Sequence, residues 1–431
     1  MKTIGENIYS IAERIFPICR SITGEGVRKT LNILSEYASG MEIYNIPSGT
    51  QVFDWIVPKE WVIREAYIED EDGRTILDLK NNNLHVMGYS APIDKWASRD
   101  ELLQYIYTQP DQPEVIPYVT SYYKERYGFC MSQNQKDSLP DGKYHMVIDS
   151  ELVKGNLTYG EIIIPGKKQD EIFLSTYVCH PSMANNECSG PALAIALADY
   201  LWKKENREYT YRIIFIPETI GAITYLSRNL DWMKEHVKAG FVLSCVGDNN
   251  DYSIVESRYG NTLADKALKN ILQSKTEGRY SRYSFLKRGS DERQYNAPGV
   301  DLPVVAFCRS KYGEYPEYHT SADNLSVISP EGLEGAYDVM TKVIEALDVN
   351  DKYKVTVLCE PQLGKRGLYP TISQKGSYDE VAAMTNVIAY ADGKNDLFDI
   401  SNIIGIPVDE LVPIIQRLKD NGLIVSDNVC G

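Results

Sequence analysis

Apolar residues recur every three or four positions in two segments near the start of the chain, on either side of the polar stretch ICRSITGEG: Ile8, Ile11 and Ile15, then Val27, Leu31 and Leu34. Side chains at this spacing share one face of an α-helix. The pattern predicts two amphipathic helices within residues 3–38 that pack on the rest of the protein.

Four later segments are apolar almost throughout: EIFLSTYV, YRIIFIPE, GFVLSCVG and VDLPVVAF. Such runs are typical of strands that are buried on both faces. A helical pattern, PALAIALADYLWKK, follows the first run, and residues 142–166 alternate apolar and polar positions as hairpin strands at a sheet edge do. This order predicts an α/β fold with a doubly wound mixed sheet.

A change of pattern marks a smaller domain between residues 48 and 110. Strand-like runs, WVIREAYIED and RTILDL, are separated there by the turn signal EDG and followed by the polar NNN. We interpret 48–110 as a small β-rich domain inserted into the α/β domain, which then comprises residues 1–47 and 111–355. Whether this insert covers the active site as a lid or only supports the scaffold is left open by the pattern.

The end of the chain has the pattern of a winged helix-turn-helix, which we assign to residues 356–431. A short helix, the turn GIP, a second helix and the strand-like NGLIV follow one another. The second helix carries Asp409, Glu410 and Asp420 against Arg417 and Lys419. Because nucleic-acid affinity depends on clustered cations, we expect this module to contact a protein or to dimerise rather than to bind DNA.

Composition supports a soluble protein of the cytoplasm. The 431 residues have a formal net charge of −15, which argues against a nucleic-acid partner for the whole molecule. The first residues include Glu6, Glu13 and Arg14, so they lack the uninterrupted apolar stretch of a signal peptide or membrane span. The eight cysteines are scattered without a CxxC pair, which fits a reducing compartment.

Polar side chains capable of catalysis follow the ends of the predicted buried strands. His180 comes directly after the first run, Glu218 closes the second, and Asp248 and His319 follow the third and fourth. Ligands and metals in open α/β sheets collect at the carboxyl ends of the strands. Since the chain has only five histidines, two of them at this edge favour a metal site over a structural role.

These residues resemble the co-catalytic zinc aminopeptidases. The motif His, loop, Asn-Asp-Asn-Ala-Ser-Gly of that family is matched here by His180 and by residues 185–190, NNECSG. Its Glu-Glu motif is matched by Glu218-Thr219, and its final His-Thr motif by His319-Thr320, followed by ISPE at 328–331. The resemblance implies a zinc-exopeptidase fold with Glu218 as general base.

A narrower resemblance covers almost the entire chain. The segments PICRSITGEG, CHPSMANNECSG, PETIG and YHTSADNL look like those of a prokaryotic aminopeptidase-like family. Its members carry an inserted β module and a C-terminal winged helix and often occur beside polysaccharide-biosynthesis functions. The resemblance thus implies the same domain organisation that the hydrophobic pattern predicts.

The sequence departs from the zinc aminopeptidases at several ligand positions. Asn186 replaces the bridging aspartate, Thr219 replaces the second glutamate, and Ser244 or Cys245 stands where the third acidic ligand falls. Glu292 replaces a histidine in the segment GSDERQY. These departures imply one zinc ion rather than two, with a metal-free scaffold as the alternative.

The expected site follows from these matches and departures. We expect His180, Glu187 and His319 to ligate the metal, Glu218 to act as base, and Asn186, Asp248 and Arg293 to contact the substrate. The predicted activity is hydrolysis of an amide bond in a peptide or an acylamino group of a sugar-linked small substrate. Alternatives are a catalytically inactive scaffold that binds a peptide, sugar or partner protein, and a regulator that reads a metabolite and binds DNA.

Two further groups of residues are open to a binding role. Five arginines near predicted strand ends or turns could clamp a carboxylate or phosphate, although surface solvation is the default for each: Arg20, Arg258, Arg288, Arg293 and Arg309. Tyrosines such as those of YVTSYYKERYG, residues 118–128, could stack on sugar rings. Cys179 and Cys188 flank the site, and small buried hydrophobes are the simpler interpretation of both.

Overall fold

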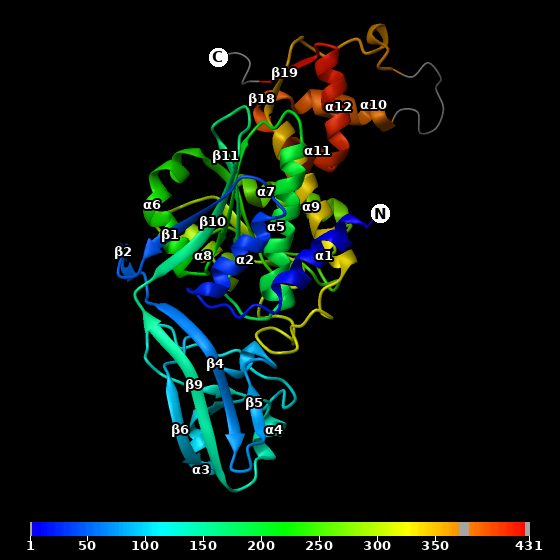
Figure 1. The fold of residues 1–431 in the computed structure, drawn as a ribbon. Helices are drawn as coiled ribbons and strands as arrows, with labels where there is room; N and C mark the ends of the chain where they lie inside the picture. Colours follow the sequence, from blue (N-terminus) through cyan, green and yellow to red (C-terminus); the bar gives the residue numbers. More distant parts are fainter. Residues whose placement is uncertain (1, 370–378, 427–431) are drawn as a thin grey trace. The chain divides into compact units, whose positions relative to one another are not determined.

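A computed structural model describes residues 2–369 and 379–426 and divides them into two compact units. The first unit runs up to Thr262 and includes Ser281–Tyr337; the second comprises Leu263–Tyr280 and the chain from Asp338 onward. The candidate site lies entirely in the first unit. Figure 1 shows the course of the chain.

The first unit is built on an eight-stranded mixed sheet, which confirms the predicted fold class. Its strands, in spatial order, are β1 (Met41–Pro47), β10 (Asn156–Ile164), β12 (Thr210–Ile216), β11 (Glu171–Tyr177), β13 (Val237–Leu243), β16 (Val304–Cys308), β14 (Ser253–Val255) and β15 (Ser281–Tyr283). The four central strands β12, β11, β13 and β16 run parallel, while β1 and β10 pair antiparallel at one edge. The predicted apolar runs are these four central strands, since two buried faces require apolar side chains throughout.

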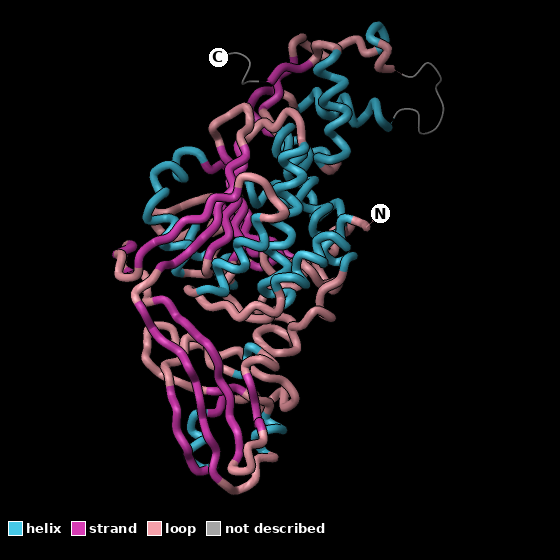
Figure 2. Tube along the Cα trace, in the orientation of Figure 1, coloured by secondary structure: helices cyan, strands magenta, loops and turns pink. Residues whose placement is uncertain are grey.

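Helices cover both faces of this sheet (Figures 1 and 2). One face carries α1 (Ile4–Ile15), α2 (Glu25–Ser35) and α5 (Ser189–Lys203); the other carries α6 (Ile220–His236) and the short α8 (Glu292–Tyr295). The two predicted N-terminal helices are confirmed as α1 and α2, and Thr3 and Glu6 close the start of α1 by a capping box. The crossovers through α5 and α6 bring the ends of β11 and β12 to one edge, where His180 and Glu218 follow.

A second, four-stranded sheet forms the inserted module. Its strands, in spatial order, are β5 (Thr75–Asp78), β4 (Glu60–Asp70), β9 (Lys143–Val153) and β6 (Ile93–Ser98). Shorter elements accompany it: the hairpin of β2 (Gln51–Val52) and β3 (Trp55–Ile56), the pair β7 (Ile106–Tyr107) and β8 (Phe129–Cys130), and the helices α3 (Arg99–Leu102) and α4 (Gln133–Asp137).

The module extends beyond the predicted limits of 48–110. Strand β9 lies outside those limits, yet it pairs with β4 along ten residues and with β6 along six. The predicted hairpin over 142–166 is therefore two strands of different sheets, β9 in the module and β10 in the main sheet. The module leaves the main sheet after Pro47 and returns before Asn156, and these two residues face each other in the β1–β10 pair.

The second unit contains the predicted winged helix. Its elements are α7 (Leu263–Lys275), the last turns of α9 (Pro330–Val349), β17 (Lys352–Val355), α10 (Asp379–Tyr390), β18 (Asp392–Asp396), α11 (Leu397–Ile404), α12 (Val408–Asp420) and β19 (Ile424–Ser426). The sheet order is β18-β17-β19, so the module starts with β17 and not at residue 356. Lys266 on α7 bridges Asp396 and Asp399 at the start of α11.

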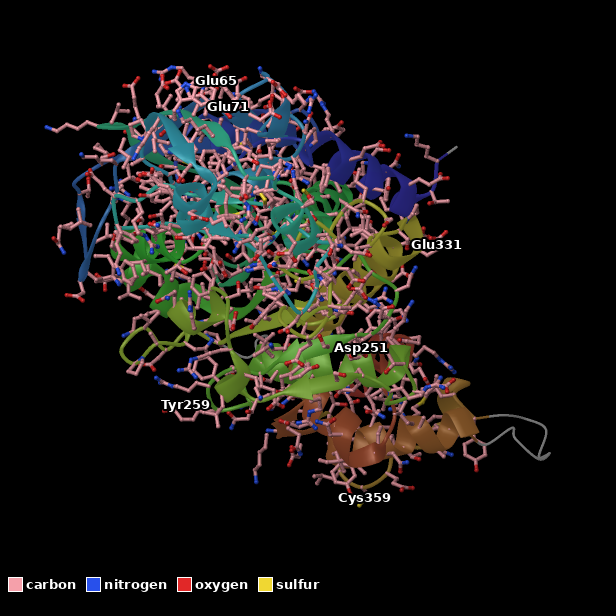
Figure 3. The ribbon with its side chains drawn as sticks, turned by 90° about the horizontal axis from the view of Figure 1, so that it is seen from below. Glu65, Glu71, Asp251, Tyr259, Glu331 and Cys359 are labelled. Carbon is pink, nitrogen blue, oxygen red and sulfur yellow. The ribbon has the colours of Figure 1, made fainter. Side chains whose placement is uncertain are left out.

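No helix in the described part of the chain is long and apolar enough to cross a membrane. The seven cysteines within the described ranges are all unpaired, and Cys359 is exposed. Figure 3 shows the side chains and labels Glu65 and Glu71, which lie at the edge of the view. It also labels Cys359.

Candidate active site

A cavity of about 380 Å³ opens at the carboxyl ends of β11 and β12. His180 and Glu218, which follow these strands, line it together with His319 from the loop after β16. The remaining lining residues are mostly aromatic or apolar: Ile22, Trp55, Tyr118, Thr120, Tyr122, Tyr123, Cys179, Thr219, Ile220 and Arg293. The structure thus brings together the three residues on which the sequence-based site was centred.

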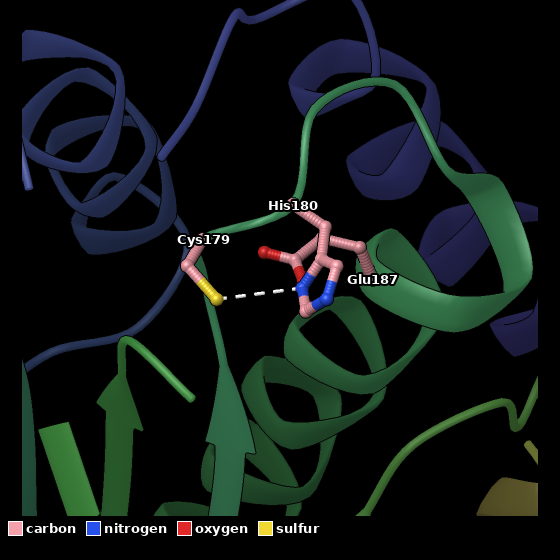
Figure 4. Close-up of side chains that lie close together, drawn as sticks. All are labelled: Cys179, His180 and Glu187. Atoms are coloured by element: carbon pink, nitrogen blue, oxygen red, sulfur yellow. Dashed lines mark hydrogen bonds and ion pairs between the residues drawn. The ribbon is translucent and has the colours of Figure 1, made fainter. Parts of the chain in front are cut away.

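His180 is buried, and its two ring nitrogens have different partners. Nδ1 lies 2.9 Å from Glu187 Oε2 and 3.3 Å from Cys179 Sγ (Figure 4). Nε2 faces Glu218, with 3.7 Å between Nε2 and Glu218 Oε2. Burial lowers the pKa of His180, but the hydrogen bond and charge of Glu187 outweigh it, so the pKa is raised overall. A carboxylate on Nδ1 fixes the ring and leaves Nε2 available to a ligand.

Glu187 is held in turn by the buried Arg20. The Arg20 guanidinium lies 3.6 Å from Glu187 Oε1, and its Nε donates a hydrogen bond to the His180 carbonyl at 2.9 Å. Both side chains are almost wholly buried. The carboxylate therefore lies between a fixed cation and the imidazole, and Arg20 is a structural counter-charge rather than an exposed clamp.

That Glu187 ligates the metal stays a prediction, and the structure shows where its carboxylate lies. Glu187 contacts His180 on the Nδ1 side and is not among the residues that line the cavity. It lies in a π-helical turn, Ala184–Cys188, whose backbone N–H groups at Asn185 and Asn186 donate to the Asp323 carboxylate at 2.7 and 3.0 Å. The turn fixes Glu187 behind the histidine, which the sequence could not indicate.

Cys179, His180 and Glu187 form a cluster whose donor atoms all lie within 4.8 Å of one another. His180 Nδ1 meets both partners, and Cys179 Sγ accepts a hydrogen bond from the Glu218 N–H at 3.2 Å. Glu187 Oε1 is buried and has no hydrogen-bond partner among the described residues. Burial raises the pKa of the Cys179 thiol well above its ordinary value. In this structure the cluster holds the His180 ring from its Nδ1 side and leaves Nε2 facing the cavity.

His319 provides a second imidazole with an unsatisfied nitrogen. Its Nε2 is buried and has no hydrogen-bond partner among the described residues, and its ring centre lies 5.3 Å from that of His180. Burial and the nearby His180 lower the pKa of His319 to about 3, so the ring is neutral. A neutral imidazole with a free lone pair is the form that binds metals.

The backbone around His319 is held in an unusual conformation. His319 has a φ of 57°, and its carbonyl accepts a hydrogen bond from the Tyr118 N–H at 2.9 Å. The Tyr118 ring lies 5.1 Å from both His180 and His319. Left-handed backbone in a non-glycine residue persists only where its surroundings hold it, and here the inserted module supplies that support.

Glu218 faces the cavity at the start of α6. The following residue, Thr219, has a φ of 63° and donates its N–H to Asp291 Oδ1 at 2.7 Å. Burial raises the pKa of the Glu218 carboxyl, and the charge of His180 opposes this rise. Thr219, not Glu218, is the residue at the N-cap of α6, so Glu218 is directed to His180 instead of capping the helix.

The positions that depart from the zinc aminopeptidases carry no carboxylate in the structure either. Asn186 Nδ2 donates to Tyr177 Oη at 2.9 Å, and its buried Oδ1 has no partner. Burial raises the pKa of Cys245 to about 12, which keeps its thiol protonated. Ser244 shares a hydrogen bond with Tyr177. Asn186, Ser244 and Cys245 therefore offer no carboxylate ligand for a second metal ion.

Two residues that we expected to contact the substrate do not line the cavity. Asp248 is buried, and its carboxylate accepts hydrogen bonds from Asn185 Nδ2, the Ser310 N–H and hydroxyl, and the Asn250 N–H, at 2.8–2.9 Å. These four hydrogen bonds occupy the Asp248 carboxylate and connect neighbouring loops. The structure therefore gives Asp248 a structural role in place of the predicted substrate contact. Asn186 is also buried outside the lining, next to Tyr177.

Arg293 and the tyrosine segment do reach the cavity. Arg293 lines it and donates from Nη2 to Thr219 Oγ1 at 2.6 Å. Tyr118, Tyr122 and Tyr123 form one wall. Trp55, which the sequence analysis missed, packs edge-on against Tyr123 with 5.6 Å between ring centres. Trp55 is an exposed residue of the short β2–β3 hairpin, and no motif in the sequence marked it.

The fold and the site together define an aminopeptidase-like α/β protein with a C-terminal winged helix. The chain belongs to the family described as a domain of unknown function (DUF4910), whose model matches residues 9–350. A winged helix-turn-helix model matches residues 351–426, which confirms the predicted module.

Relatives support this assignment. The chain is 47% identical over 400 residues, 92% of this chain and 91% of the relative, to a Clostridium acetobutylicum protein provisionally named as a polysaccharide biosynthesis protein with an aminopeptidase-like domain. A crystal structure from the same organism, described as a provisionally assigned peptidase, has a TM-score of 0.92 and 43% identity, covering 98% of this chain and 96% of that one. A Bacillus subtilis zinc aminopeptidase has a TM-score of 0.57 and 13% identity, covering 80% of this chain and 95% of that one, and shares the fold.

Proposed function

We propose that this protein hydrolyses an amide bond, in a peptide or an acylamino group of a sugar-linked small substrate, with the help of one zinc ion. The observation that carries the proposal is the pair of imidazoles at one cavity: His319 Nε2 is buried without a partner, and His180 Nε2 faces the same space beside Glu218. An orphaned buried nitrogen carries a free-energy penalty unless a ligand satisfies it.

His180 and His319 would hold the metal. Zinc supplies Lewis-acid chemistry in hydrolases, polarising the carbonyl that is attacked. Glu187 keeps the His180 ring oriented through Nδ1, and the Arg20 guanidinium lies 3.6 Å from the Glu187 carboxylate. Together these residues present a fixed nitrogen to the cavity.

Glu218 would act as the general base. A buried carboxylate with a raised pKa accepts a proton more readily than an ordinary one, which suits it to deprotonate water. The hydroxide adds to the acyl carbon, the C–N bond breaks, and the proton held by Glu218 passes to the leaving amine. The products are a carboxylic acid and an amine, which become a carboxylate and an ammonium ion when the acid proton passes to the amine.

The test is metal content by elemental analysis, on wild-type protein and on His180→Ala and His319→Ala. We expect close to one zinc per chain in wild type and loss in both variants, whereas His145→Ala, a histidine on β9 of the inserted module, retains it. Glu218→Gln is expected to keep the metal and to lose at least about 100-fold in hydrolysis rate. Wild-type protein that stays metal-free after zinc is added would exclude this proposal.

A metal-free outcome would favour a second function, that of a binding module. The replacement of carboxylates by Asn186, Thr219 and Cys245 is the observation on its side. In that case the cavity binds a peptide or sugar without cleaving it.

The setting of the reaction is also part of the proposal. The unpaired cysteines in the described ranges suit a reducing cytoplasm. The relative's name links its own protein to polysaccharide biosynthesis, and the tyrosine wall of this cavity suits a sugar-linked substrate. We assign the winged helix to a protein partner, because its second helix carries three acidic side chains and only two basic ones.

A further inference from the structure

Arg293 places a positive charge at the cavity, where it opposes the rise in the pKa of the Glu218 and Asp291 carboxyls. Its Nη2 donates to Thr219 Oγ1 at 2.6 Å, its Nε is buried without a hydrogen-bond partner, and it forms no ion pair with any carboxylate in the described part of the chain. A guanidinium that keeps free donors in a partly buried site is a binding site for a carboxylate or phosphate.

Thr219 orients this guanidinium without neutralising it. The Thr219 backbone is fixed by its N–H bond to Asp291 Oδ1, and its hydroxyl is an uncharged acceptor for Arg293. A carboxylate at position 219 would pair with Arg293 instead and occupy its donors. The threonine therefore leaves the charge available to a ligand.

The cavity offers no matching place for a substrate ammonium group. Glu218 is the only carboxylate among the lining residues, and it already faces His180 at 3.7 Å. An ammonium group near Arg293 would experience like-charge repulsion at low dielectric. The remaining walls are aromatic and apolar, formed by Tyr118, Tyr122 and Trp55 among others, and suit an uncharged side chain.

We propose that the substrate is an N-acyl amino acid or a related amide whose amine portion carries a carboxylate, bound by Arg293, and not a peptide with a free amino terminus. This inference rests on the proposed function, since it takes the bond next to His180, His319 and Glu218 as the one that is cleaved. It makes Arg293 the residue that selects the substrate by charge.

Three probes that share a tyrosine side chain test the proposal: N-acetyl-L-tyrosine, which is anionic, N-acetyl-L-tyrosinamide, which is neutral, and L-tyrosinamide, which is cationic. Binding to the full chain is measured by calorimetry. We expect the anion to bind about 10- to 100-fold more tightly than the neutral probe, and the cation to bind most weakly.

Three variants locate the effect. Arg293→Met should remove the preference for the anion, and Thr219→Glu should remove it as well through an internal ion pair. Arg288→Met removes an exposed arginine from the same segment and should leave the preference intact. Circular dichroism on each variant checks that it is folded.

The outcomes separate this inference from the proposed function. Equal or tighter binding of the cation, an unchanged preference in Arg293→Met, or no binding of any probe would overturn the inference. Release of free tyrosine from L-tyrosinamide but not from the N-acetyl acid would support the hydrolase and overturn the inference. Selective binding of the anion without cleavage would support the anion site and count against the hydrolase.

Discussion

At the scale of single residues, the site depends on the different environments of the two nitrogens of His180. Nδ1 meets a carboxylate that a buried arginine holds, and Nε2 meets the cavity. Without Glu187 the imidazole could rotate or change tautomer, and without Arg20 the buried Glu187 carboxylate would lack a counter-charge. The chain from Arg20 through Glu187 to His180 is therefore a positioning device.

Glu187→Gln distinguishes positioning from ligation. The glutamine keeps an oxygen that can accept from His180 Nδ1 but removes the charge that faces Arg20. We expect zinc affinity to fall by about 10- to 100-fold without being lost, because the direct ligands remain. Chelator competition measures the affinity.

The control for this variant is Glu36→Gln, which removes a surface ion pair with Arg14 and should leave zinc affinity unchanged. If Glu187→Gln lost its metal as completely as His180→Ala does, Glu187 would be a direct ligand and the positioning interpretation would be wrong.

Sequence reasoning located His180, Glu218, His319 and Arg293 because strand ends and motif spacing are local features. It could not show that Asp248 is saturated by Asn185 and Ser310, since these partners are 63 and 62 residues away. Likewise Arg20 and Glu187 are far apart in the chain, and only the packing of the N-terminal segment on α5 makes them neighbours. Roles that depend on long-range contacts are not visible in one sequence.

At the scale of elements, the central strands were predictable and the strand partners were not. The four central strands consist mainly of apolar residues, and this composition predicted that both of their faces are buried: β11, β12, β13 and β16. Strand β9 alternates like an edge strand, and alternation shows which face is buried but not which strand lies alongside. For this reason the limits of the inserted module were drawn too narrowly.

The first turn of helix α12 contacts other helices of the second unit. The Val408 N–H donates to Asn270 Oδ1 on α7 at 2.9 Å, and Asp409 pairs with Lys342 on α9 at 3.0 Å. In helix-turn-helix proteins the first residues of the second helix are those that contact bases. Here these residues are committed to protein contacts.

We therefore expect the full chain to bind duplex DNA only weakly, with a dissociation constant of roughly 10 μM or more at physiological salt and no sequence preference. Fluorescence anisotropy on labelled duplexes of different sequence, at low and physiological salt, measures this. Submicromolar affinity for one sequence would contradict the assignment and favour the regulator that the sequence analysis left open.

At the scale of the whole first unit, the inserted module contributes to the candidate active site. It supplies Tyr118, Tyr122 and Tyr123 to the cavity wall and supports the His319 backbone through Tyr118. The main sheet supplies His180 and Glu218. Neither sheet alone forms the complete cavity, which favours the lid over the simple support among the two roles that the sequence left open.

Excision of the module tests whether its tyrosines contribute to ligand binding. The chain can be rejoined between Val57 and Gly155 by a short Gly-Ser linker, because the Val57 carbonyl accepts from Gly49 at 2.8 Å and Gly155 accepts from the neighbouring Ser48 at 2.9 Å. The excised protein keeps the Trp55 hairpin and β1–β10 pair but loses the tyrosine wall. We expect binding of N-acetyl-L-tyrosine to weaken by at least about tenfold while far-ultraviolet circular dichroism still reports a folded α/β protein.

A single substitution in the intact chain gives the same test without a large deletion. Tyr122→Ala removes one ring of the wall, whose hydroxyl lies 3.0 Å from that of Tyr118, and leaves both sheets complete. It should weaken binding of N-acetyl-L-tyrosine by about three- to tenfold, whereas Tyr37→Ala, which removes an exposed tyrosine outside the cavity, should not. Unchanged binding in Tyr122→Ala would mean that the tyrosine wall does not contact this ligand. In that case the module would act on the site only through the backbone of His319, as a support and not as a lid.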